Sequence, residues 1–358
     1  MKAILILADG YQFSGEAIGR QGESIGELIL NTAVVGYQEM MTDPANAGKI
    51  LVLTYPLIGN YGISQKFNES SQCWLNGLVI KEKSRIYSNW QAKESFEDFV
   101  KEQNLIVISE IDTRTLAVHL RDKGEMLGII STRTTDTKEL LSKIKDWRKN
   151  QVKDFLSKIS VKKPTRVGNK RARYKVAILD LGLTQSMIRQ VEALGCLLYI
   201  FPYNTKAKEI LEAKPQGLII SHGPEDDAGL EEVVSNVKPL IAKIPILGIS
   251  TGHQVLASAL GAKINRMKLG HHGLNYPVAG LGLYKDKITV QNHSYVVDND
   301  SLAKIKDIKI TGYNTNDHTI EEMESHRLKL IGIQYYPASP GFDEVNEVFK
   351  RFIKILKR

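Results

Sequence analysis

The stretch from Pro245 to Leu260, PILGISTGHQVLASAL, most constrains what this chain can fold into. Residues 244–249 are apolar and partly β-branched, and they have the length of a buried parallel strand. The turn sequence GISTG at 248–252 leads directly into helix-forming residues at 254–260. A strand, a sharp turn and a helix in this order hold the residue at the turn, Ser250, above the edge of the sheet, with backbone N–H groups beside it. The stretch therefore predicts a nucleophile position with part of an oxyanion hole.

Length and composition bound the class of protein. A chain of 358 residues is too long for one ordinary core and predicts two domains. The N-terminal apolar run is too short for a signal peptide, and no stretch is long enough to span a membrane. The two cysteines, Cys73 and Cys196, exclude a disulfide framework, which suits the reducing cytoplasm. We expect a cytoplasmic protein that is not in a membrane.

The net charge of +8 is concentrated in one stretch. Between Val161 and Lys175 there are seven basic residues and no acidic ones: Lys162, Lys163, Arg166, Lys170, Arg171, Arg173 and Lys175. The stretch also holds Pro164 and Gly168, and its single aromatic residue, Tyr174, is not an interleaved pattern that would suggest stacking on bases. It is interpreted as a solvated linker between domains, and no nucleic-acid partner is expected.

The C-terminal half alternates between apolar runs and helical patterns. The predicted strands are 176–181, 197–201, 217–221, 245–249 and 328–334, and the predicted helices are 185–194, 206–213, 230–241, 254–260 and an amphipathic one at 343–356. This alternation predicts an α/β fold with a doubly wound parallel sheet. Ligands of such sheets bind at the carboxyl ends of the strands, where both Ser250 and the loop 221–227 lie.

The N-terminal half is richer in strand patterns. Residues 2–7 and 12–18 predict a β-hairpin, and residues 28–44 and 50–62 predict two buried strands around a polar turn. A helix should begin after Asp112, which can cap it, and end at Gly124.

Longer motifs resemble a known family. The string GISTGHQ at 248–254, with GAK at 261–263 and GHHGLNYPV at 270–278, closely resembles the elbow of the class I glutamine amidotransferases, as found in the small subunit of carbamoyl-phosphate synthetase. Residues 28–62 and 111–124 resemble the N-terminal domain of that subunit, which other glutamine amidotransferases lack. The resemblance implies a β-rich small-subunit domain at 1–150, a basic linker at 151–174 and an amidotransferase-like domain at 175–358. It also implies a heterodimer with the large synthetase subunit, which makes carbamoyl phosphate for pyrimidine or arginine biosynthesis; the pathway stays open.

The resemblance allows each catalytic position to be compared with the family. The family's elbow reads GICLGHQ, so Ser250 stands where the nucleophilic cysteine is expected. Tyr336 stands at the position of the histidine base, and a phenol, whose ordinary pKa is about 10, is a poor proton acceptor at neutral pH. The glutamate that orients the base has no counterpart, because the string after Pro337 is one residue short. Glutamine hydrolysis is therefore expected to be lost.

The implied glutamine pocket has changed as well. Ala45 replaces a serine, Glu225 replaces a glycine in the loop that should face the substrate, and Ser294 and Tyr295 replace a glycine and a phenylalanine. Thr251 is also a changed position of the elbow, whereas Gly223, Gln254 and Asn292 remain as in the family. A bulky anion in a tight loop opposes the original ligand, so glutamine binding is doubtful.

Two hypotheses follow. In the first, the chain is a small-subunit homologue without glutaminase activity that acts as the structural or regulatory partner of an ammonia-dependent large subunit. In the second, Ser250 works with His222 as a serine hydrolase or altered amidohydrolase. Among the other histidines considered as bases, His253 is interpreted as structural, His271 and His272 belong to a motif that the family has beyond the elbow, and His293 stays a candidate. No metal-ligand spacing occurs, and neither a metal nor a cofactor is expected.

Overall fold

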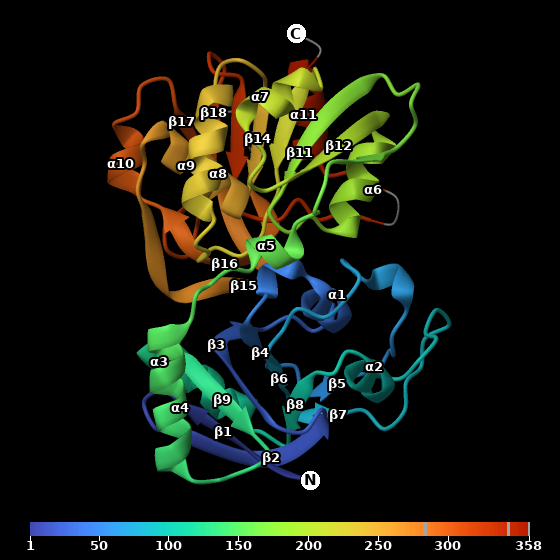
Figure 1. The fold of residues 1–358 in the computed structure, drawn as a ribbon, viewed down its shortest axis with the longest axis vertical. Coiled ribbons are helices and arrows are strands. Elements are labelled where there is room, and N and C mark those ends of the chain that lie inside the picture. The colour runs from blue at the N-terminus through green and yellow to red at the C-terminus, as the bar shows by residue number, and fades with distance from the viewer. Residues whose placement is uncertain (282–284, 342–343, 357–358) are drawn as a thin grey trace. The chain divides into compact units, whose positions relative to one another are not determined.

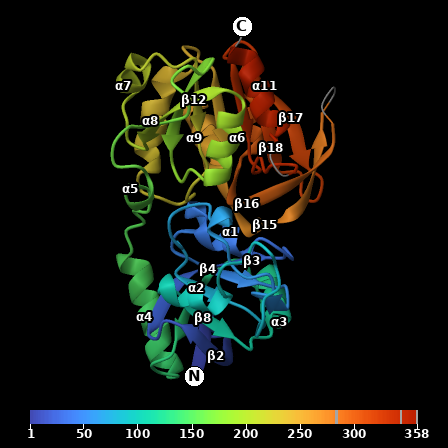
Figure 2. The same ribbon diagram turned by 90° about the vertical axis from the view of Figure 1, so that its right-hand side faces the viewer.

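The computed structural model describes residues 1–281, 285–341 and 344–356. The chain forms two compact units. The first comprises Met1–Val152 together with Lys268–His272, and the second comprises Lys153–Met267 and Gly273–Arg358. Figures 1 and 2 show the elements of each unit, coloured along the chain.

The first unit is built around a closed barrel whose strand order is β1-β2-β8-β6-β4-β3-β9. Its strands are β1 (Lys2–Leu7), β2 (Gln12–Gly19), β3 (Glu23–Asn31), β4 (Lys49–Leu53), β6 (Gly77–Val79), β8 (Ile106–Ser109) and β9 (Leu127–Ser131), with a separate pair β5 (Leu57–Ile58) and β7 (Glu82–Lys83). Its helices are α1 (Tyr37–Thr42), α2 (Phe96–Glu102), α3 (Thr113–Lys123) and α4 (Thr137–Asn150), with 3₁₀ turns η1 (Pro44–Asn46) and η2 (Gln65–Phe67). Closure pairs β1 with β9, which leaves the barrel without an open edge.

The sequence predicts several of these elements correctly and one connection wrongly. β1 and β2 form the predicted antiparallel hairpin. Helix α3 has Asp112 at its N-cap and Gly124 at its C-cap, as predicted. The two buried strands β3 and β4 are parallel, however, and α1 and η1 lie between them in place of a polar turn. A parallel pair needs a crossover connection, and a turn cannot supply one.

The second unit contains a ten-stranded sheet with the order β10-β12-β11-β13-β14-β19-β18-β17-β15-β16. Its strands are β10 (Thr165–Val167), β11 (Tyr174–Asp180), β12 (Cys196–Pro202), β13 (Gly217–Ile220), β14 (Ile246–Ile249), β15 (Ile264–Gly280), β16 (Lys287–Val297), β17 (Lys309–Asn314), β18 (Ile320–Ser325) and β19 (Leu330–Ile333). Its helices are α5 (Leu156–Ile159), α6 (Gln185–Ala193), α7 (Ala207–Glu212), α8 (Leu230–Val237), α9 (Thr251–Leu260), α10 (Asn299–Ala303) and α11 (Glu347–Leu356), with the 3₁₀ turn η3 (Lys238–Leu240). The five strands from β12 to β19 are parallel.

Helices cover both faces of this sheet, which confirms the doubly wound α/β prediction. Along β11, Ala177 and Leu179 pack into one core with α8 and α9, whereas Val176 and Ile178 pack into another with α6 and α11. Alternate residues of a strand point to opposite faces, so a strand that is apolar throughout can be buried on both.

The basic stretch differs from the expected linker. Residues 151–174 contain α5 and the edge strand β10, which pairs antiparallel with β12. Two of the arginines lie over aromatic rings, Arg166 over Tyr199 at 5.0 Å and Arg173 over Tyr174 at 5.4 Å. The predicted C-terminal helix begins at Glu347, and Asp343, where it was expected to begin, lies outside the described residues.

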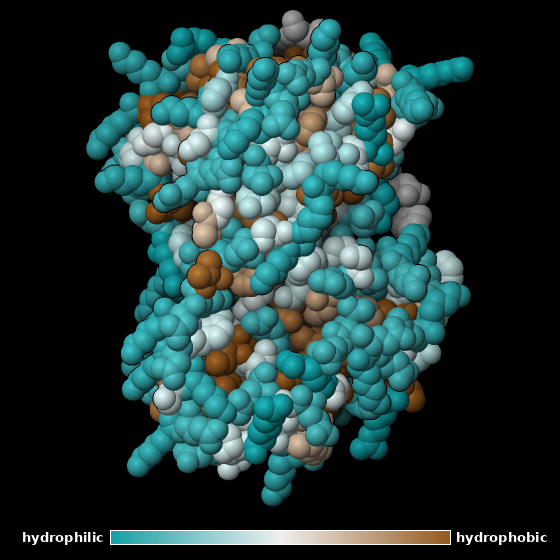
Figure 3. Space-filling view, viewed as in Figure 1, coloured by the Kyte–Doolittle hydropathy of each residue, from teal (hydrophilic) through white to brown (hydrophobic). Residues whose placement is uncertain are grey.

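The molecular surface is largely polar on the face drawn in Figure 3, where hydrophobic residues occur in small scattered groups. In the described part of the chain, no helix combines the length and the apolar character needed to cross a bilayer.

Candidate functional site

The predicted strand–turn–helix is present at the carboxyl edge of the parallel strands. β14 ends at Ile249, α9 begins at Thr251, and Ser250 lies between them with φ 50° and ψ −110°. A positive φ is costly for a residue with a side chain and persists only where neighbouring contacts enforce it. Here the backbone N–H of Ser250 donates to the carbonyl of Ile333 on β19 at 2.7 Å. The neighbouring strand therefore holds the strained turn in place.

Two glycines allow the elbow to approach the ends of its neighbouring strands. A Cβ at Gly252 would lie 2.1 Å from the carbonyl oxygen of Ile220 on β13. A Cβ at Gly223 would lie 1.9 Å from the carbonyl oxygen of Leu181, directly after β11. No other residue fits these positions, because real Cβ atoms do not approach an oxygen so closely. Thr251 joins the two segments further, since its hydroxyl donates to the carbonyl of Gly223 at 2.6 Å.

The hydroxyl of Ser250 is isolated. The residue is 1% exposed, and its Oγ makes no hydrogen bond with any residue that the structure describes. A serine nucleophile needs an acceptor for its proton within hydrogen-bond distance. Among the residues that the structure describes, no side chain is hydrogen-bonded to the Ser250 hydroxyl.

His222 and Tyr336 pack against each other near the carboxyl ends of β13 and β19. Their ring centroids are 4.4 Å apart and the rings are inclined by 39°. The backbone N–H of Tyr336 donates to the carbonyl of Val290 at 2.8 Å, and the side-chain amide of Asn292 donates to the Tyr336 hydroxyl at 3.3 Å. The structure thus brings together three residues of the predicted site: His222, Asn292 and Tyr336.

Two hydrogen bonds hold the backbone directly after Tyr336. The N–H of Ala338 donates to the carbonyl of Tyr336 at 2.9 Å, and the side-chain amide of Gln190 on α6 donates to the carbonyl of Pro337 at 2.9 Å. Both contacts involve backbone groups next to the position where the family's orienting glutamate is expected. Gln190 was not predicted from the sequence, because an amide on an amphipathic helix carries no signal of its own.

His253 lies on α9 and is completely buried. A Cβ at Gly332 on β19 would lie 2.4 Å from its Nδ1, so the ring fills the space that this glycine leaves. Burial lowers the pKa of His253 to about 3, which keeps the ring neutral. Neither ring nitrogen has a hydrogen-bond partner within the described parts of the chain. These contacts agree with the structural interpretation of this histidine.

The side chain of Glu225 extends from the loop after β13 and is 9% exposed. Its Oε1 accepts from the side-chain amide of Gln254 at 2.6 Å and from the N–H of Tyr295 at 3.3 Å, and its Oε2 accepts from the N–H of Ser294 at 2.6 Å. All four of these positions belong to the predicted pocket. Burial raises the pKa of the Tyr295 phenol to about 12.

The remaining predicted residues lie in the first unit. Ala45 is buried in η1, where its N–H donates to the carboxylate of Asp43 at 2.9 Å. His271 and His272 lie in the segment 268–272, and His272 pairs with Glu125 at 3.0 Å with both side chains fully buried. The sequence did not predict the Glu125 partner, because the two residues are far apart along the chain.

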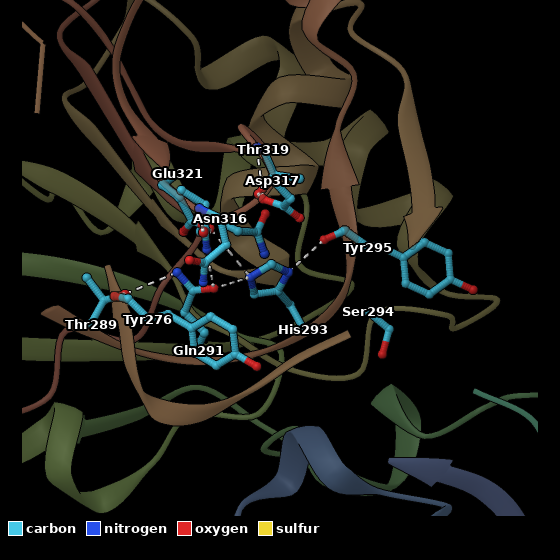
Figure 4. A network of polar contacts seen from close by, with 12 residues as sticks. Tyr276, Thr289, Gln291, His293, Ser294, Tyr295, Asn316, Asp317, Thr319 and Glu321 are labelled. Carbon is cyan, nitrogen blue, oxygen red and sulfur yellow. Dashed lines mark hydrogen bonds and ion pairs between the residues drawn. The ribbon is translucent and has the colours of Figure 1, made fainter. Parts of the chain in front are cut away.

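A buried polar network supports the end of β16 (Figure 4). His293 contacts the side-chain oxygen of Gln291 at 3.1 Å through Nε2 and the carbonyl of Tyr295 at 3.1 Å through Nδ1. The side-chain amide of Asn314 bridges the oxygens of Gln291 and Glu321, each at 3.4 Å. Burial raises the pKa of Glu321 well above its ordinary value. The sequence analysis did not predict this network. Its one sequence signal is the acidic pair Glu321-Glu322, which lies between the apolar residues Ile320 and Met323.

Comparison with known proteins gives one match for each unit. Residues 177–355 match the model of the class-I glutamine amidotransferases, and residues 5–130 match that of the carbamoyl-phosphate synthase small chain, CPSase domain. The second unit with its elbow therefore defines a class I glutamine amidotransferase fold.

Relatives extend this result to the whole chain. The carbamoyl phosphate synthase small chain of Syntrophotalea carbinolica is 37% identical over 100% of this chain and 98% of its own length. That of Chlorobaculum tepidum is 36% identical over 99% of this chain and 98% of its own length. The pyrimidine-specific small chain of Bacillus subtilis is 36% identical over 100% of this chain and 96% of its own length. The chain belongs to the family of carbamoyl phosphate synthase small chains.

Proposed function

We propose that this protein is a small chain that does not hydrolyse glutamine and serves as the structural or regulatory partner of a large synthetase subunit, in a heterodimer that uses free ammonia. The observation that carries the proposal is the isolation of the Ser250 hydroxyl, which is buried at the elbow and makes no hydrogen bond within the described residues.

The chemistry of the neighbouring positions supports the proposal. Covalent release of ammonia from glutamine requires an activated nucleophile, a base and a group that orients the base. A hydroxyl depends on its base more than a thiol does, because a thiol is far more acidic. Tyr336, at the expected base position, packs on His222, and its hydroxyl accepts from the side-chain amide of Asn292. The carbonyl of the next residue, Pro337, accepts from the side-chain amide of Gln190. Each requirement is therefore unmet by the side chains at the expected positions.

The test is to reconstitute the protein with a large synthetase subunit and to compare nitrogen donors. We expect carbamoyl phosphate synthesis with ammonium, and glutamine-driven synthesis slower by at least about 10³-fold, the scale on which a missing catalytic group reduces acyl transfer. A glutamine-dependent small chain reconstituted with the same large subunit is the control. Glutamine-driven synthesis as fast as ammonium-driven synthesis would refute the proposal.

The serine hydrolase hypothesis makes a different prediction. It needs His222 to accept the proton of Ser250, and the Ser250 hydroxyl makes no such hydrogen bond. A fluorophosphonate probe should therefore not label the protein. Labelling that disappears in Ser250→Ala would favour the hydrolase instead.

A further inference from the structure

The carboxylate of Glu225 sits in a cluster of N–H donors. Its Oε2 accepts from the backbone N–H of Ser294, and its Oε1 accepts from the next N–H, that of Tyr295, and from the side-chain amide of Gln254. Consecutive backbone N–H groups joined by an amide side chain are a typical receptor for a carboxylate, whose two oxygens are strong acceptors. The cluster has the chemistry of a binding site for a small carboxylic acid.

Other contacts hold these donors in place. Gln254 also donates to the carbonyl of Tyr295 at 3.0 Å and contacts the side-chain oxygen of Gln334 at 3.4 Å. The carbonyl of Tyr295 lies 3.1 Å from Nδ1 of His293, and a dashed line in Figure 4 marks this contact. The donors are therefore positioned by α9, β16 and β19, and they should stay in place when the Glu225 side chain is removed.

The loop that carries Glu225 is anchored on its other side. Asp226 forms an ion pair with Lys153. Asp227 accepts from the N–H groups of Phe155 and Leu156, at 2.5 and 3.1 Å, and from that of Gly229 at 2.8 Å. A group fixed in this way has a high effective concentration at its receptor and needs little additional ordering to bind there.

We propose that Glu225 is a built-in ligand: its carboxylate occupies a receptor for small carboxylates and closes the pocket to free acids such as acetate and amino acids. The assignment of amino acids as a ligand class rests on the proposed function, because it assumes that this pocket derives from a glutamine site. The receptor itself follows from the three N–H donors.

The experiment opens the receptor with Glu225→Ala and supplies acetate, with chloride at equal ionic strength as the reference. The variant should be less stable than the parent protein, and acetate should raise its melting temperature. Calorimetry should give a Kd for acetate at least about tenfold lower than for the parent protein, because the tethered competitor is gone. A crystal structure of the variant in acetate should show the anion bound to Gln254, Ser294 and Tyr295.

Two further variants separate this effect from a general response to anions. Glu209→Ala removes an exposed carboxylate on α7, away from the Glu225 loop, and acetate should not stabilise it more than the parent protein. Glu225→Ala with Gln254→Ala removes one donor and should weaken acetate binding. Glu225→Gln keeps the side-chain shape, so it remains a usable variant if the alanine protein does not fold. Its NH₂ group cannot accept from an N–H, so its acetate response should exceed that of the parent protein.

Three outcomes would overturn the inference. One is that neither Glu225 variant responds to acetate more than Glu209→Ala does. Another is that the parent protein binds acetate as tightly as Glu225→Ala. The third is saturable binding of L-glutamine to the parent protein that competes with acetate. Since these measurements report binding, failure of the acetate response leaves the proposed loss of glutamine hydrolysis intact, whereas ammonia release by the parent protein would refute that loss directly.

Discussion

At the scale of single residues, the backbone at Ser250 has the geometry of a nucleophile position, whereas its hydroxyl makes no hydrogen bond with any described residue. The turn still enforces a positive φ on the residue, and the ends of the neighbouring strands still require glycine at 252 and 223. The side chains around this turn make other contacts. Glu225 binds the cluster of N–H donors, and the rings of His222 and Tyr336 pack against each other. Backbone features and side-chain chemistry are thus separable at this elbow.

The first prediction concerns restoring the nucleophile. Ser250→Cys should release no measurable ammonia from glutamine, and neither should Ser250→Cys combined with Tyr336→His. Catalytic groups that act as a unit fail together, and Glu225 still occupies the donors at Gln254 and Ser294. Recovery should require at least Glu225→Gly and a glutamate inserted after Pro337 as well. Ammonia release is measured for each variant with and without a large subunit, and appreciable turnover by the single cysteine variant would show that the pocket is functional.

The second prediction is a pH dependence that comes from His253. Its pKa is about 3 in the folded protein, against an ordinary value near 6.5, because burial disfavours the charged ring. Between these values the unfolded chain binds more protons than the folded chain, so the stability contributed by the neutral ring is present above about pH 6.5 and is lost as the pH falls. The expected loss from this residue is about 1.4 kcal/mol per pH unit inside that window.

Replacing His253 with methionine removes the titrating group while keeping a similar volume. Urea unfolding at pH 7, 6 and 5 should show the free energy of unfolding falling less steeply for His253→Met than for the parent protein. Leu256→Met on the same helix is the control: Leu256 is equally buried and does not titrate, so the substitution should leave the slope nearly unchanged. Equal slopes for the parent protein and His253→Met would contradict the assignment.

At the scale of secondary-structure elements, the end of β14 and the start of α9 depend on the close approach of β13. Gly252 in the first turn of α9 faces the carbonyl of Ile220, and this contact cannot be relieved by a side-chain rotation because both partners are backbone. Gly261, at the other end of the same helix, has φ +102° and open space where a Cβ would point. Adding a Cβ at Gly252 would therefore cause a steric clash, whereas adding one at Gly261 would only strain the backbone conformation.

The third prediction compares alanine at these two positions. Gly252→Ala should reduce the free energy of unfolding by about 3 kcal/mol or more, because the strand and the helix must move apart. Gly261→Ala should cost only about 1–2 kcal/mol, the penalty of a left-handed backbone at a residue with a Cβ. Urea unfolding of both variants provides the comparison. Similar losses would mean that the elbow can relax.

At the scale of the whole molecule, the two units are not two consecutive stretches of chain. The segment Lys268–His272 lies within strand β15 but belongs to the first unit. There the carbonyl of Lys268 accepts from the N–H of Glu125 at 2.9 Å, and the carboxylate of Glu125 accepts from the N–H of Gly270 at 3.0 Å and pairs with His272. The first unit is incomplete without a segment that the chain supplies more than a hundred residues later.

The fourth prediction is that residues 1–152 alone form a less stable barrel than in the full chain. Without the returning segment, Glu125 loses the N–H of Gly270 and the ring of His272, two hydrogen-bond partners, and each lost hydrogen bond to a charged group costs about 1.5–3 kcal/mol. A synthetic peptide of residues 264–276 should bind the fragment and raise its melting temperature, whereas the same peptide with His272→Ala should do so less. A fragment that is as stable without the peptide as with it would contradict this account.

The amino-acid sequence by itself determined the elements that depend on neighbours along the chain. The hairpin of β1 and β2, the capped helix α3, the alternation of strands and helices in the second unit and the elbow at Ser250 all follow from local patterns of apolar, turn and capping residues. The sequence also predicts that residues 225, 250 and 336 differ from the family, because these positions lie inside recognisable motifs.

Only the tertiary structure decided what depends on residues brought together from distant parts of the chain. It showed β3 and β4 to be parallel, it placed β10 on the edge of the sheet where a linker was expected, and it paired His272 with Glu125. It also turned Glu225 from a residue expected only to obstruct the pocket into one bound by Gln254, Ser294 and Tyr295. Local patterns report propensity and burial, whereas a hydrogen bond between segments dozens of residues apart depends on the position of each segment after folding, and no single stretch of sequence contains that information.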